Sequence, residues 1–97
     1  MIRLTEIFSA GVEYDSELTM AKEEFGVREI YLNPDHIISV SQNLVLAAKA
    51  QERELIEGLN KELPFTQIFL DSPRYSPQKV NVIGAPEHII EKIDKGR

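Results

Sequence analysis

Side chains alternate with a period of two along five stretches of the chain, a pattern that predicts β-strands because successive residues of a strand point to opposite faces. In the first stretch Ile2 and Leu4 share one face, with Glu6 next in the same row. The stretch Phe65 to Asp71 (FTQIFLD) is largely apolar on both faces, which favours a central strand. The five predicted strands cover residues 2–8, 27–32, 36–40, 65–71 and 79–84.

Turn-forming residues separate these strands. Ser9-Ala10-Gly11 predicts a turn after the first strand. Asn33-Pro34-Asp35 predicts a second turn, because Pro34 keeps Asn33 extended and suits the second position of a β-turn. The strands on either side of this second turn, 27–32 and 36–40, are expected to form a tight strand–turn–strand unit.

Residues 12–25 fit two patterns. Val12, Tyr14, Ser16, Leu18 and Met20 repeat every second residue, as in a strand. Leu18, Ala21 and Phe25 instead fit helical spacing, with Asp15 or Ser16 as the cap. We favour a strand through Leu18 and a short helical turn before Gly26, which would stop either element.

Two helices are predicted. The first covers residues 43–62, with Asn43 as N-cap, fraying at Gly58 and an end at Pro64. The second follows Pro86, which suits the first turn of a helix, and Gly96 can cap its end. The apolar positions of the two helices are Leu55, Ile56, Leu59 and Leu63 in the first and Ile89, Ile90 and Ile93 in the second.

Together these elements predict an α+β fold: a small, mostly antiparallel sheet of about five strands with one inserted helix and a C-terminal helix. The 97 residues fit a single domain, residues 1–97. The longest apolar run, Leu44 to Ala48, is far shorter than the roughly 20 residues that span a bilayer. Thr5 and Glu6 interrupt the start of the chain, so we expect no signal peptide and a cytoplasmic protein.

Composition excludes several chemistries. The chain has no cysteine, which rules out disulfides, thiolate zinc sites, iron–sulfur clusters and thiol catalysis. The sequence shows no nucleophile elbow and no glycine-rich phosphate loop. His36 and His88 lie 52 positions apart and have no ligand spacing around them. We therefore predict no enzyme activity, no cofactor and no metal site.

The net charge of −5 is uneven along the chain. Residues 1–48 hold three Lys and Arg against eight Asp and Glu, whereas residues 49–97 hold eight of each sign. No basic cluster occurs, which argues against a nucleic-acid partner. A site for an anion is therefore expected in the second half of the chain.

The loop Ser72 to Pro77 (SPRYSP) is the strongest candidate binding segment. Its prolines lower the entropy cost of ordering on binding, and Arg and Tyr are enriched at binding hot spots. We expect Arg74 to bind a phosphate or carboxylate and Tyr75 to stack or pack on a ligand. Arg28 or Lys79, expected on adjacent strands, would complete a site for a small anionic ligand. The alternative is a solvated connection between two strands.

Three segments resemble known small proteins: residues 1–5, 29–38 and 80–93. The chain resembles the FlbD-like family, which is associated with flagellar and swarming regulation, and is similar to small phage proteins of unknown function. That resemblance implies a phage-encoded protein acting inside a bacterial host cell, or alternatively a regulator that works through protein or nucleic-acid contacts. The shared positions are Asn33, Pro34 and His36; Phe65 and Thr66; and Gly84, Pro86 and Glu87.

The small size of the chain also bears on its partners. A 97-residue domain buries more apolar surface when it oligomerises, and exposed sheet edges need protection. Strands 27–32 and 65–71 and the helix start at Leu44 to Ala50 are candidate interface segments. We expect a homo-oligomeric, non-enzymatic binding protein that acts on a host factor by binding a host protein or a small anionic, nucleotide-like ligand.

Overall fold

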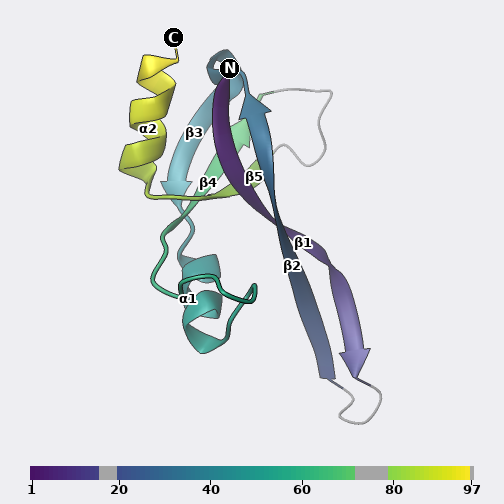
Figure 1. The fold of residues 1–97 in the computed structure, drawn as a ribbon. Coiled ribbons are helices and arrows are strands. Elements are labelled where there is room, and N and C mark those ends of the chain that lie inside the picture. The colour runs from purple at the N-terminus through teal and green to yellow at the C-terminus, as the bar shows by residue number, and fades with distance from the viewer. Residues whose placement is uncertain (16–19, 72–78, 97) are drawn as a thin grey trace.

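The computed structural model describes residues 1–15, 20–71 and 79–96 and has an α+β fold, as predicted (Figure 1). Five antiparallel strands form one sheet, with two α-helices and one short 3-10 helix. In chain order the elements are β1 (Ile2–Asp15), β2 (Met20–Leu32), a 3-10 helix (Pro34–His36), β3 (Ile37–Gln42), α1 (Leu44–Glu52), β4 (Phe65–Leu70), β5 (Lys79–Ile83) and α2 (Pro86–Lys95).

The strand order is β2-β1-β5-β4-β3, so β2 and β3 lie at opposite edges of the sheet. The expected tight unit of these two strands is therefore wrong. Asn33 caps the 3-10 helix by accepting a hydrogen bond from the Asp35 amide at 3.0 Å. The Asp71 amide then donates to the His36 carbonyl at 2.9 Å, which ties the end of this helix to the end of β4. The short helix directs the chain across to β4 instead of back along β2.

The sheet must curl, because residues 33–36 alone connect its two edges. Five strands in a flat sheet would separate the edge strands by about 19 Å, at a spacing of about 4.8 Å. The five residue steps from Leu32 to Ile37 reach about 18 Å at most when fully extended. Since this link contains a 3-10 helix, which rises only about 2 Å per residue, its real span is shorter. The sheet is therefore curved, and its edge strands β2 and β3 lie closer together than they would in a flat sheet.

Strands β1 and β2 form a long two-stranded ribbon that projects beyond the rest of the sheet (Figure 1). Their pairing runs from Ile2 opposite Leu32 to Asp15 opposite Met20, whereas β5 pairs with β1 only at Glu6 opposite Val82. The described part of the ambiguous segment 12–25 is strand. The expected helical turn before Gly26 is therefore wrong, and Leu18 lies outside the described residues.

Two glycines act differently from what the sequence predicted. Gly11 does not form a turn: it lies at a bulge in β1, where its φ of +128° is a conformation that suits glycine. Gly26 lies inside β2 and does not end it. The ring of Phe8 lies over this glycine. A Cβ atom at position 26 would come within 2.7 Å of the Phe8 ring.

Helix α1 begins where expected and ends ten residues earlier than predicted, at Glu52 instead of residue 62. Asn43 is its N-cap, with the Leu46 amide donating to Asn43 Oδ1 at 2.9 Å. The chain then becomes extended at Arg53, whose guanidinium donates to the backbone carbonyl of Glu23. Leu55 is buried although it lies outside the helix. The apolar positions after residue 53 thus reach the core from an irregular segment.

The two helices cover two separate cores. Helix α2 begins at Pro86 as predicted, and its Ile89 and Ile93 pack over Ile2, Leu4 and neighbouring strand residues. Helix α1 contributes Leu46 and Ala50 to a second cluster. The other buried members of this cluster are Ile7, Leu55 and Phe65. Ile7 and Glu6 point to opposite faces of β1 because they are successive strand residues. No helix in the described parts of the chain is long and apolar enough to cross a bilayer.

Candidate functional site

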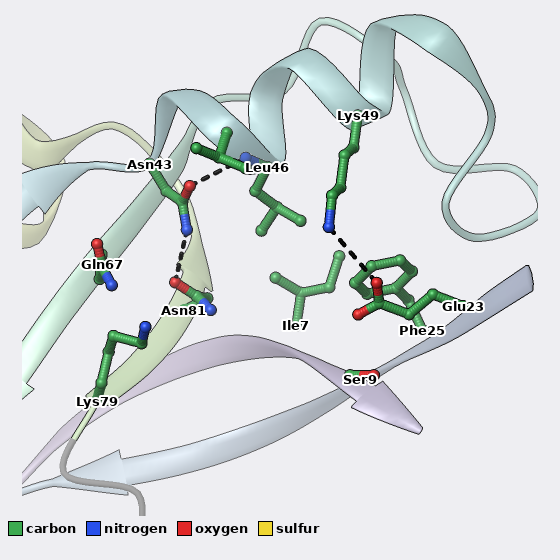
Figure 2. A pocket seen from close by; sticks show the side chains of 11 residues that line it. Ile7, Ser9, Glu23, Phe25, Asn43, Leu46, Lys49, Gln67, Lys79 and Asn81 are labelled. Carbon is green, nitrogen blue, oxygen red and sulfur yellow. Dashed lines mark hydrogen bonds and ion pairs between the residues drawn. The ribbon is translucent and has the colours of Figure 1, made fainter. Parts of the chain in front are cut away.

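A pocket of about 330 Å³ lies between α1 and the sheet (Figure 2). Small-molecule sites occupy roughly 300–1,000 Å³, so the volume suits a small ligand. The pocket is lined from four strands and one helix, by Ile7, Ser9, Glu23, Phe25, Asn43, Val45, Leu46, Lys49, Gln67, Lys79 and Asn81.

One end of the pocket is polar. Gln67 on β4 lies directly opposite Asn81 on β5, and Lys79 is two residues before Asn81 on the same face of β5. The Asn43 amide group donates from Nδ2 to Asn81 Oδ1 at 2.8 Å. The backbone amide of Asn43 donates to the carbonyl of Phe65 at 2.8 Å, which fixes the start of α1 against β4. A hydrogen bond thereby joins the N-cap residue of α1 to a residue of β5 that lies 38 positions away in the sequence.

The other end of the pocket is mainly apolar. Ile7 on β1 and Phe25 on β2 lie beneath α1, next to Glu23 (Figure 2). Lys49 on α1 forms an ion pair with Glu23, with Nζ and Oε2 at 3.4 Å. This pair joins the helix to the ribbon and leaves the aromatic ring of Phe25 among the lining groups. The pocket therefore offers an apolar and aromatic end opposite a polar one.

The charge of the pocket differs in sign from that of the whole chain. Among the described lining residues, Lys49 and Lys79 face one acid, Glu23, which gives these residues a net charge of +1 in a chain of −5. Within the part of the chain that the structure describes, Lys79 forms no ion pair. Of the two lysines that line the pocket, Lys79 is thus the one without an acidic partner among the described residues.

The structure places the four residues predicted to bind a ligand in different locations. Lys79 lines the pocket. Arg28 does not, because it lies opposite Glu6 on the other face of the sheet. Its Nε lies 2.5 Å from Glu6 Oε1, and its guanidinium stacks on Phe8 at 4.8 Å from the ring centre. Strand β1 also separates Arg28 on β2 from Lys79 on β5, so the two are not on adjacent strands. Arg74 and Tyr75 lie outside the described residues.

The two histidines lie apart. His36 Nδ1 is 3.2 Å from Asp71 Oδ1, and both side chains are largely exposed. His88 is on the exposed side of α2. Within residues 1–15, 20–71 and 79–96, no three or more His, Asp or Glu side chains gather in a way that would hold a metal ion.

Sequence reasoning missed the amide residues of the pocket. The stretch 79–83 alternates polar and apolar residues, so Lys79 and Asn81 lie on the same face of the strand. Two neighbouring polar side chains on one face of a strand indicate a candidate binding surface. Asn43 was recognised only as a helix cap. Its contact with Asn81 depends on how α1 lies against the sheet, which no local pattern encodes. No family model, curated protein or solved structure matches the chain.

Proposed function

We propose that the protein is a non-enzymatic binding protein that holds a small anionic, nucleotide-like ligand in the pocket beneath α1. The observation that carries this proposal is the placement of Lys79, beside Asn81, at the end of the pocket opposite Phe25. A cation beside carboxamide groups suits a phosphate or carboxylate, since charge-assisted hydrogen bonds are the strong ones. The ring of Phe25 and the side chain of Ile7 suit a flat, partly apolar group such as a nucleobase.

Replacing Lys79 with alanine is expected to weaken binding of adenosine and uridine 5′-monophosphates by roughly tenfold or more, because a hydrogen bond to a charged group contributes about 1.5–3 kcal/mol. Isothermal titration calorimetry measures this change. Lys95→Ala is the matched control, since Lys95 is exposed on α2 and pairs with Glu91. Equal affinities for the two variants, or no binding to the unmodified protein, would contradict the proposal.

We further propose that the protein self-associates through the edge of β2. Val27 and Tyr31 lie on one face of this edge strand and are 45% and 60% exposed. Exposed edges pair readily with another strand, and a second copy would extend the sheet and place cross-strand neighbours beside both side chains.

A lysine at position 27 should therefore shift the protein towards monomer, as measured by native mass spectrometry, because it places a charge at the proposed contact. Ile90→Lys is the matched control, since Ile90 is similarly exposed, at 47%, but lies on α2. Self-association through β2 is wrong if Val27→Lys leaves the subunit count unchanged.

A further inference from the structure

The hydrogen bonds around Asn43 determine which way its carboxamide faces. Nitrogen and oxygen of such a group are hard to distinguish by shape, so the partners decide. The backbone amide of Leu46 is a donor, so the atom that it reaches, at 2.9 Å, must be the oxygen of Asn43. The nitrogen of Asn43 is then the atom directed at Asn81. Capping of α1 thereby fixes Asn43 as a donor towards the pocket wall.

The orientation of Asn81 follows from that of Asn43. Because Asn43 presents an NH2 group, the atom of Asn81 at 2.8 Å must be the acceptor, Oδ1. The Nδ2 atom of Asn81, with its two hydrogens, points the other way. Figure 2 shows this nitrogen on the side of Asn81 away from Asn43, in the pocket that Asn81 lines. Asn81 therefore directs its donor group into the pocket, while its Oδ1 accepts from Asn43.

Lys79 adds three more donors on the same face of β5. The side chains of Lys79 and Asn81 are next neighbours along that face, because they are two residues apart in a strand. Among the described residues, neither Lys79 Nζ nor Asn81 Nδ2 has a hydrogen-bond acceptor. Two adjacent donor groups facing one cavity are suited to a group that only accepts hydrogen bonds.

We propose that Asn81 Nδ2 and Lys79 Nζ together bind the terminal oxyanion of the ligand, a phosphate or a carboxylate, and that Asn43 is the positioning residue that turns Asn81 towards it. The proposal rests on the proposed function and names the group that this end of the pocket selects. Adenosine, which lacks the oxyanion, should bind at least tenfold more weakly than its 5′-monophosphate. Inorganic phosphate and acetate, titrated separately, distinguish the two oxyanions.

The direct test is nuclear magnetic resonance of the side-chain NH2 groups during titration with adenosine 5′-monophosphate. The Asn81 signals are assigned by their loss in Asn81→Asp. In the unmodified protein they should shift on titration, and the Asn43 signals should move less because Asn43 faces Asn81. A purely structural role of Asn81 would not produce this shift.

Affinity measurements give the second test. Asn81→Asp keeps an oxygen that accepts from Asn43, so the thermal midpoint should change little, but it removes the donor and should weaken monophosphate binding at least tenfold. Gln67→Glu is the matched control, because it adds the same charge at the cross-strand neighbour of Asn81. Its effect should be clearly smaller. A further variant, Asn43→Asp, retains the helix cap and should also weaken binding, since Asn81 would turn its NH2 group towards the new carboxylate.

The outcomes separate this proposal from the proposed function. If Lys79→Ala loses binding while the Asn81 NH2 signals stay fixed, the role of Asn81 is overturned and the binding function stands. The role of Asn81 is also overturned if Asn81→Asp and Gln67→Glu weaken binding equally. If none of the probes binds the unmodified protein, both proposals fail.

Discussion

Phe65→Ala is expected to lower the free energy of unfolding by about 3–5 kcal/mol, the usual cost of truncating a buried phenylalanine. Phe65 is fully buried, at 0% exposure, in the cluster beneath α1. Ile7 and Leu46 belong to the same cluster and also line the pocket. A cavity at position 65 would therefore loosen the packing on which the site rests. Urea denaturation followed by circular dichroism measures the loss.

The matched control for this prediction is Phe69→Ala, four residues along the same strand. Phe69 is 39% exposed, so its truncation should cost clearly less, about 1–2 kcal/mol. Because small domains are stable by only about 5–15 kcal/mol, Phe65→Ala leaves little margin, and Phe65→Leu provides a milder variant. Equal losses at positions 65 and 69 would show that the cluster beneath α1 does not hold the fold together.

The strands could be predicted from the sequence because their signal is local. Side chains in β4 and β5 alternate within five or six residues, and this pattern identifies a strand wherever it lies. The central position of β4 also followed from its two apolar faces, and the structure confirms it between β3 and β5. The C-terminal helix was predictable for the same reason, from its isoleucines and from Pro86 at its start.

The path of the chain between elements was not predictable in this way. The turn residues Asn33-Pro34-Asp35 could return the chain along β2 or direct it to the far edge of the sheet. The backbone hydrogen bond from Asp71 to His36, residues that are 35 positions apart, accompanies the second path. Leu55 and Leu59 are spaced as in a helix, yet they reach the core from an irregular segment. Apolar residues at helical spacing can share one buried face. Their spacing alone does not show that the backbone between them is helical.

The pocket was partly predictable. Lys79 was recognised as a candidate cation from its charge and position, and it does line the pocket. The orientation of the Asn81 carboxamide depends on its hydrogen bond with Asn43, which is distant in sequence. Arg28 was expected to face a ligand because its partner could not be identified before the register of β1 and β2 was known. That register places Arg28 directly opposite Glu6.

Arg28→Met is expected to cost about 2 kcal/mol of stability, because it leaves the Glu6 carboxylate without its partner. Glu6 is only 7% exposed, and Arg28 Nε is its ion-pair partner at 2.5 Å. Methionine retains an unbranched side chain beside Phe8, so the loss reports mainly on the charge and the hydrogen bond. Arg3→Met, at an exposed position of β1, is the matched control and should change stability by less than about 0.5 kcal/mol.

The same pair predicts an asymmetry between the two single variants, and a double variant tests its cause. Glu6→Gln should cost less than Arg28→Met, because the amide oxygen still accepts from Arg28 and no buried charge is left behind. Combining Glu6→Leu with Arg28→Met removes both charges and should recover part of the stability that Arg28→Met alone loses. If the single Arg28→Met variant is as stable as the unmodified protein, Glu6 is satisfied by water and the pair does not stabilise this face of the sheet. A recovery in the double variant would instead show that the main role of Arg28 is to pair with the Glu6 carboxylate.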